Sequence, residues 1–172
     1  LLHDRDILVR MDDSVVALQP QPAPSRSPQP AQPLFFRRAR GYVPRPVFLA
    51  KSLTSSAPGV LGAGAGLKAT VCLTLADRAF VSQHIGDLEN AATLDFYTEV
   101  ITHLENLQKI RPHALVCDLH PDFLSTRYAE DRARREGLPL WRLQHHAAHA
   151  ASVLAENGHC APALALCLDG TG

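Results

Sequence analysis

From residue 70 onward, short apolar runs alternate with amphipathic segments, and this alternation constrains the fold more than any other feature. Residues 114–118 form a continuous apolar run that ends in a carboxylate, which is typical of a buried strand in a parallel sheet. Residues 92–110 carry apolar side chains at the three- and four-residue spacing of a helix with one buried face. The alternation predicts an α/β domain in which helices cover a largely parallel sheet.

The remaining predicted elements complete this α/β pattern. Two strands at 70–75 and 79–82 form a hairpin, because a polar turn separates them. Further helices are expected at 125–136 and 147–157, each followed by a glycine that can end it. The last two strands are expected at 140–143 and 163–168, the second of them buried because it is apolar throughout.

Two stretches of unusual composition divide the chain. Six prolines fall between residues 19 and 33, so this insert can only be extended or disordered. Residues 52–66 are rich in serine and glycine and predict a domain boundary. The glycine-rich stretch at 62–68 predicts a flexible hinge, since a phosphate loop would be followed by a helix and not by a strand. We therefore predict a first segment at 1–49, a linker at 50–66 and a domain at 67–172. The chain lacks an initial methionine, and we expect it to be a piece of a longer polypeptide.

The overall composition excludes several classes of protein. Lysine plus arginine and aspartate plus glutamate both number 17, and this balance argues against a nucleic-acid-binding surface. No apolar run approaches the roughly 20 residues of a membrane span. The four cysteines form no Cys-x-x-Cys pair, which argues against a zinc knuckle and favours a reducing, cytoplasmic location. We expect neither a nucleic acid nor a membrane as a partner.

Polar residues follow three of the predicted strands, and ligands bind at the carboxyl ends of parallel strands. His145 and His149 are four residues apart, so on a helix their imidazoles lie on one face and can grip one metal ion. Asp169 follows the last predicted strand and can add an oxygen ligand. This donor set suits zinc or iron better than calcium. The alternative is that these polar residues merely cap a helix over the core. A zinc peptidase is disfavoured, because His146 stands where its motif requires glutamate.

Five segments occur in an order that is more specific than any one of them: residues 10–16, 37–42, 82–90, 118–122 and 144–150. Together they resemble the hydrogenase maturation carbamoyltransferase family, HypF. The resemblance implies that residues 1–49 end a YrdC-like α/β domain. It also implies that residues 67–172 begin a Kae1-like domain of the sugar-kinase/Hsp70/actin, ribonuclease-H-like fold.

The activity that the resemblance implies is an ATP-dependent carbamoyl transfer. Carbamoyl phosphate and ATP would give carbamoyl-adenylate, and the carbamoyl group would pass to the C-terminal cysteine of a HypE-type partner protein. This reaction leads to the cyanide ligands of NiFe-hydrogenase. A piece of 172 residues is expected to be inactive alone. The alternatives are a relative of the tRNA threonylcarbamoyl transferases, which share the two-histidine helix, and a truncated remnant without catalytic activity.

The resemblance also implies roles for individual residues. The metal ligands are His145, His149 and Asp169. The groups that bind carbamoyl phosphate and nucleotide are Arg10, Ser14, Arg38, Arg40, Lys68, Gly170 and Gly172. The groups placed on the substrate side, as catalytic candidates, are His84, Asp87 and His120. This chain departs from the family pattern at Ala17, Gly66 and Ala69, where arginine, glutamate and asparagine are expected.

Overall fold

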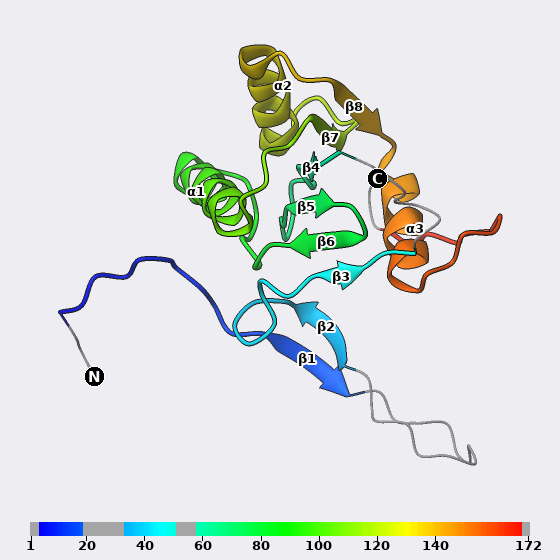
Figure 1. The fold of residues 1–172 in the computed structure, drawn as a ribbon, viewed down its shortest axis with the longest axis horizontal. Helices are drawn as coiled ribbons and strands as arrows, with labels where there is room; N and C mark the ends of the chain where they lie inside the picture. The colour runs from blue at the N-terminus through cyan, green and yellow to red at the C-terminus, as the bar shows by residue number, and fades with distance from the viewer. Residues whose placement is uncertain (1–3, 19–32, 51–57, 170–172) are drawn as a thin grey trace.

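The computed structural model describes residues 4–18, 33–50 and 58–169, which form two sheets and three helices (Figure 1). A two-stranded sheet pairs β1 (Val15–Leu18) with β2 (Pro33–Arg37). A six-stranded sheet has the order β3-β6-β5-β4-β7-β8. Its strands are β3 (Val47–Phe48), β4 (Val60–Gly62), β5 (Cys72–Leu75), β6 (Arg78–Val81), β7 (Ala114–Asp118) and β8 (Leu140–Leu143). The helices are α1 (Ala91–Gln108), α2 (Leu124–Glu136) and α3 (His145–Glu156).

The larger sheet is mixed, and its topology brings four strand ends to one edge. β4, β7 and β8 are parallel, while β5 runs antiparallel to both β4 and β6. β6 therefore runs in the same direction as β4, and the carboxyl ends of β4, β6, β7 and β8 share one edge. The loops after these strands meet there: Ala69 bridges to Gly86, and the Leu119 N–H donates to the Leu143 carbonyl. The α/β class is thus confirmed, although the predicted hairpin makes the sheet less parallel than expected.

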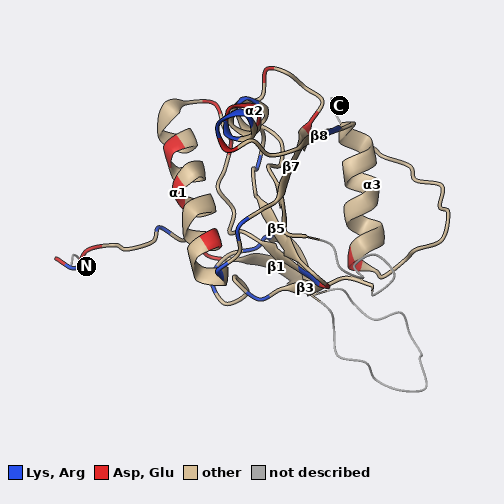
Figure 2. Ribbon diagram, turned by 45° about the horizontal axis from the view of Figure 1, so that its top comes forward, with Lys and Arg blue, Asp and Glu red and all other residues tan. Residues whose placement is uncertain are grey.

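Helices lie on both sides of the larger sheet, with α1 and α2 on one side and α3 on the other (Figure 2). The core lies under α1 and α2, where Leu61, Leu73 and Leu115 of the sheet are completely buried. Tyr97 of α1 is also fully buried, and its hydroxyl donates to the Ala63 carbonyl at 2.6 Å. α3 contains no fully buried residue. Within the described residues, no helix combines the length and apolar character needed to cross a membrane.

Local sequence signals explain where the helices begin and end. The Asn90 side chain accepts the Thr93 N–H at 3.0 Å and caps α1. Gly137 follows α2 with a φ of 66°, the left-handed conformation that glycine adopts without strain. Gln144 caps α3 by accepting the Ala147 N–H at 2.9 Å. α3 therefore begins two residues earlier than predicted, and His145 is its first residue.

The predicted linker contains the central strand of the sheet, and this part of the prediction is wrong. β4 pairs with β5 on one side and with β7 on the other. Leu61 and Ala63 are completely buried, and a Cβ on Gly59 would lie 3.1 Å from Ile110. Small residues are present here because neighbouring groups pack closely, whereas the sequence pattern suggested flexibility. Residues 51–57 of the linker and residues 19–32 of the insert lie outside the described residues.

The prediction of a strand at 163–168 is also wrong, because these described residues form none. The segment forms no strand and lies beside α3. Its side chains Leu164, Leu166 and Leu168 are each more than four-fifths exposed. An apolar sequence forms a strand only when another strand satisfies its backbone groups. No described strand pairs with this segment.

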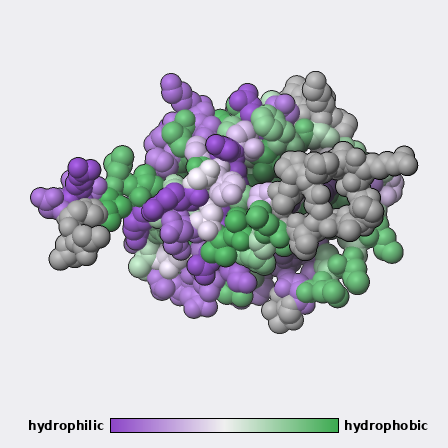
Figure 3. All heavy atoms as spheres, turned by 90° about the horizontal axis from the view of Figure 1, so that it is seen from below, coloured by the Kyte–Doolittle hydropathy of each residue, from purple (hydrophilic) through white to green (hydrophobic). Residues whose placement is uncertain are grey.

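The first segment of the chain packs against the larger sheet. β3, which falls in the predicted segment 1–49, pairs with β6. The β1–β2 hairpin exposes large apolar side chains, among them Leu18 and Phe36. Apolar groups are visible on the face of the molecule that Figure 3 shows, the side on which the hairpin lies in Figure 1. The division into two domains stays a prediction.

A buried ion pair joins α1 to α2 on the side away from α3. Arg132 and Glu105 are 7% and 4% exposed at their side chains, and their Nη1 and Oε1 atoms lie 2.6 Å apart. Glu136 accepts from Arg132 Nε at 2.9 Å. The second carboxylate oxygen of Glu105 accepts from Arg111 at 3.0 Å, but the Arg111 side chain is 75% exposed. Glu105 therefore depends mainly on Arg132 for its charge compensation.

We expect Arg132→Met to lower the free energy of unfolding by about 3–5 kcal/mol, since it leaves the Glu105 charge buried without its main partner. Arg111→Met removes an exposed partner of the same carboxylate and should cost about 0–1 kcal/mol. Urea unfolding of both variants and the unsubstituted chain measures the difference. Equal losses in the two variants would contradict the assignment of Arg132 as the principal partner.

Candidate metal centre

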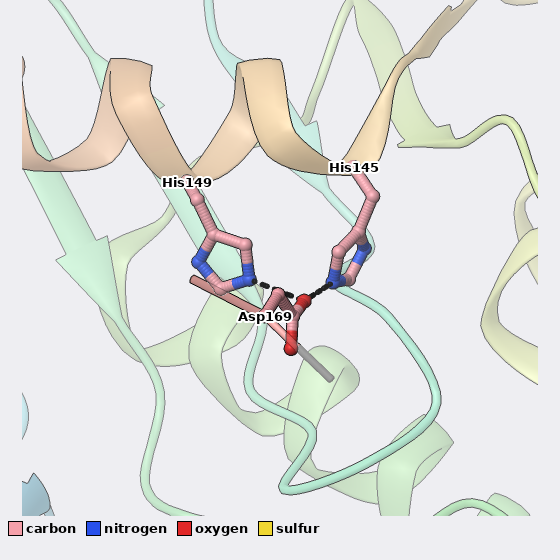
Figure 4. Close-up of side chains that lie close together, drawn as sticks. All are labelled: His145, His149 and Asp169. Carbon is pink, nitrogen blue, oxygen red and sulfur yellow. Dashed lines mark ion pairs between the residues drawn. The ribbon is translucent and has the colours of Figure 1, made fainter. Parts of the chain in front are cut away.

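The three predicted metal ligands come together at the sheet edge (Figure 4). His145 and His149 lie one turn apart at the start of α3, and Asp169 reaches them from the segment beside that helix. Oδ2 of Asp169 lies 3.0 Å from Nε2 of His145 and 3.4 Å from Nε2 of His149. One ligand atom from each residue can be chosen so that all three lie within 4.8 Å of one another. In the part of the chain that the structure describes, this is the one such group of His, Cys, Asp or Glu.

The geometry and the donor types fit a divalent transition metal. Two atoms bound to one tetrahedral zinc at about 2.0–2.1 Å are about 3.3 Å apart, close to both distances from Asp169. Two imidazoles and a carboxylate are ligands that zinc and iron accept readily. The side chain of His149 is 57% exposed, so the site opens toward solvent and has room for a further ligand or a substrate.

A fourth side chain, Asp118, holds His145 from the opposite side of the imidazole ring. Asp118 ends β7 and pairs in register with Leu143, so its carboxylate lies beside the first residue of α3. Its Oδ2 is 2.6 Å from Nδ1 of His145, and its side chain is only 8% exposed. Asp118 is not among the predicted site residues. Its position at the end of a strand, next to the strand that precedes the histidine helix, is the signal that identifies it.

The Asp118 hydrogen bond raises the pKa of His145, and the nearby charges of Asp118 and Asp169 act in the same direction against desolvation. Without a metal ion, the protonated imidazole is therefore favoured between two carboxylates. A metal ion must displace that proton from Nε2, because only the unprotonated nitrogen can be a ligand.

We expect the metal-free protein to lose stability as the pH rises through the pKa of His145. Folding favours the protonated ring, so this contribution is fully present below about pH 6.5, the pKa of an unfolded histidine, and disappears above the raised pKa of the folded state. Urea unfolding in EDTA, at pH values below and above this window, compares the unsubstituted protein with His145→Gln. The stability difference should shrink with rising pH, and a constant difference would contradict the assignment.

A cavity of about 330 Å³ lies beside the two histidines. The loop after β4, the carboxyl end of β7 and the start of α3 form its walls. Gly64 in this loop has a φ of 70°, and a Cβ there would lie 2.3 Å from the Thr70 carbonyl oxygen. The glycine-rich stretch is thus a tight turn against the start of the hairpin, and the flexible hinge predicted at 62–68 is wrong. The two histidine side chains are thus accessible from this cavity.

His120 lies on the loop after β7, at the same edge of the sheet. Its ring stacks on Phe123 with the centroids 4.3 Å apart, and its Nδ1 accepts the Asp122 N–H at 3.2 Å. In the neutral ring, Nε2 is therefore the nitrogen that carries a proton and can donate it. A Cβ on Gly66 would lie 3.2 Å from Phe123, so the stacked pair occupies space that a larger residue would need. The catalytic role of His120 stays a prediction.

The loops after β4 and β6 carry Lys68, His84 and Asp87. Oδ1 of Asp87 accepts the backbone N–H of Lys68 at 2.6 Å. The His84 N–H donates to the Arg38 carbonyl, and burial, followed by the charge of Arg37, lowers the pKa of His84. The three residues lie in loops at the edge of the sheet that holds the carboxyl ends of β4 and β6, but outside the metal-ligand cluster. Their roles stay predictions.

The candidate phosphate-binding residues of the first segment contact other groups of the chain. The guanidinium of Arg38 donates to three backbone carbonyls, those of Val81, Tyr42 and Arg45. Arg10 pairs with Glu99, Ser14 donates to the Arg40 carbonyl, and Arg40 pairs with Asp13. Arg38 thereby joins the first segment to the end of β6. The phosphate contacts of these four residues stay predictions, and Gly170 and Gly172 lie outside the described residues.

Comparison with known families identifies the class of protein to which this fold and site belong. Residues 55–156 match the family model described as HypF Kae1-like domain. The chain therefore belongs to the HypF Kae1-like domain family. The match begins inside the predicted linker, ahead of β4, in agreement with the place of that strand in the sheet.

Curated relatives match the whole length of the chain. It is 52% identical, over 172 residues, to carbamoyltransferase HypF2 of Cupriavidus necator. It is 45% identical to carbamoyltransferase HypF of Rhizobium leguminosarum over 99% of the chain. In both comparisons the chain spans 20% of the relative's length, about one fifth.

Two solved structures have the same fold. One is a full-length HypF in a phosphate- and nucleotide-bound form, with a TM-score of 0.76 and 37% identity over 91% of this chain and 22% of that one. The other is HypF of T. kodakarensis, with a TM-score of 0.75 and 30% identity over 92% of this chain and 19% of that one. The resemblance seen in the sequence is confirmed, as is the α/β fold.

Proposed function

We propose that this chain is part of an ATP-dependent carbamoyltransferase of hydrogenase maturation. The complete protein would convert carbamoyl phosphate and ATP to carbamoyl-adenylate and pass the carbamoyl group to the C-terminal cysteine of a HypE-type partner. The names of the relatives support carbamoyl transfer. The observation that carries the proposal to this part of the protein is the convergence of His145, His149 and Asp169 beside a cavity.

The three convergent side chains would hold a zinc or iron ion. His145 and His149 provide neutral nitrogen ligands, and Asp169 provides a negative charge that offsets part of the charge of the ion. When bound, the ion supplies Lewis-acid chemistry, polarising the carbamoyl carbonyl and holding phosphate oxygens. The exposed side of His149 leaves this chemistry open to a substrate that enters from the cavity.

The cavity would receive the reacting end of the substrate. Its volume of about 330 Å³ is at the lower end of small-molecule sites, which suits a carbamoyl or phosphate group better than a whole nucleotide. The related full-length structure in its phosphate- and nucleotide-bound form supports a site for such ligands. At the same edge, His120 would donate from Nε2 to an oxygen of the substrate, because its Nδ1 is already an acceptor.

In the full-length protein, His149→Ala should remove the bound metal and lower carbamoyl transfer by at least about 100-fold, more than the loss of an outer partner of a ligand. Metal content and mass spectrometry of the partner's C-terminal peptide, after incubation with carbamoyl phosphate and ATP, measure the two effects. His146→Ala is the matched control, since its ring contacts Gln144 and lies outside the ligand cluster.

Undiminished transfer by the His149→Ala protein would exclude a metal held by this histidine from the reaction. Equal losses in His149→Ala and His146→Ala would also contradict the proposal, because the effect would then not be specific to the ligand position.

A further inference from the structure

We infer that Asp118 is a positioning residue: it orients His145 toward the metal and, through its second oxygen, fixes the loop that carries His120. The inference rests on the proposed metal centre. It adds to that centre a carboxylate that binds no metal itself but acts on a ligand and on a candidate substrate group.

The contact between Asp118 and His145 selects the nitrogen that faces the metal. Oδ2 of Asp118 lies 2.6 Å from Nδ1 of His145, so a ring that binds a metal ion through Nε2 keeps its proton on Nδ1 and donates it to the carboxylate. Nε2, which faces Asp169 at 3.0 Å, is then the nitrogen that gives up its proton when the ion binds. Carboxylates that contact the outer nitrogen of a histidine ligand fix both the tautomer and the ring orientation.

The protein scaffold holds the Asp118 carboxylate in place. Asp118 is the last residue of β7 and is paired in register with Leu143 of β8. Its carbonyl is 3.5 Å from the hydroxyl of Thr126 on α2, and its side chain is almost completely buried. A carboxylate fixed in this way can hold an imidazole with little further loss of side-chain freedom. In the described residues, the His149 ring has no equivalent carboxylate on Nδ1.

The second oxygen of Asp118 extends its influence to the rim of the cavity. Oδ1 accepts the backbone N–H of His120 at 2.9 Å. That loop then places the His120 ring against Phe123, with the planes 12° apart. One buried carboxylate therefore contacts both a metal ligand and the loop that presents a second imidazole. Its loss should disturb the two groups together.

The test measures zinc binding by the full-length protein with Asp118→Asn and Asp118→Ala. Alanine removes both contacts and should weaken zinc binding by about 10–100-fold, the usual loss for an outer partner of a ligand. Asparagine keeps an oxygen that can accept from Nδ1 and should restore part of the affinity. Asp122→Asn is the matched control, because Asp122 is exposed, pairs with Arg127 and lies outside the group of three ligands; it should leave zinc affinity unchanged.

A second readout follows the tautomer directly. Nitrogen NMR of His145, in the zinc-bound protein, should show zinc on Nε2 and a proton on Nδ1 in the unsubstituted protein, and a mixture of Nε2-bound and Nδ1-bound rings in Asp118→Ala. A substitution that only lowered stability, in a protein that remains folded, would not change the tautomer of His145. If Asp118→Ala does not fold, Asp118→Asn supplies the same comparison, with a smaller expected change in affinity.

The outcomes separate this inference from the metal proposal, with His149→Ala measured beside the Asp118 variants. Absence of zinc binding in the unsubstituted protein would overturn both. Loss of zinc in His149→Ala, together with unchanged affinity and an unchanged tautomer in both Asp118 variants, would overturn only the role of Asp118. A smaller loss of zinc affinity in Asp118→Asn than in Asp118→Ala, with unchanged affinity in Asp122→Asn, would support the role of Asp118.

Discussion

The parallel pairing of β7 with β8 is the constraint on which the candidate site depends. It sets the end of one strand beside the start of α3, so that Asp118 meets His145. The helix then places His149 one turn further on, and both imidazoles face Asp169. A shift of one residue in this register would turn the Asp118 side chain to the other face of the sheet and break the contact.

The same edge of the sheet gathers the groups that the proposed carbamoyl transfer would need. Two imidazoles and a carboxylate converge on one side of a cavity, and a tight glycine turn forms another of its walls. The loop with His120 follows β7, and the backbone N–H of His120 donates to Asp118. The chain spans 20% of the length of one HypF relative, so in the proposed function these groups would be part of a larger reaction site.

The strands at 114–118 and 140–143 could be predicted from the sequence, and so could the shared helix face of His145 and His149, because strand pattern and helical spacing act over a few residues. Asp169 lies beside them as expected, although the strand predicted before it does not form. β4 could not, since its small residues reflect close packing with distant segments such as Ile110. The strand expected at 163–168 was wrong for a related reason: an apolar run reveals no partner for its backbone. Asp118 was missed because its role depends on a neighbouring strand, a relation that spacing along the chain does not contain.

Anomalous diffraction at the zinc and iron absorption edges, from crystals of the full-length protein, tests the central claim most directly. The account predicts one ion within about 2.0–2.1 Å of Nε2 of both His145 and His149, with Asp169 as an oxygen ligand and Asp118 on the far nitrogen of His145. An ion bound elsewhere, or an ion held through Nδ1 of His145 with Asp118 turned away, would contradict it.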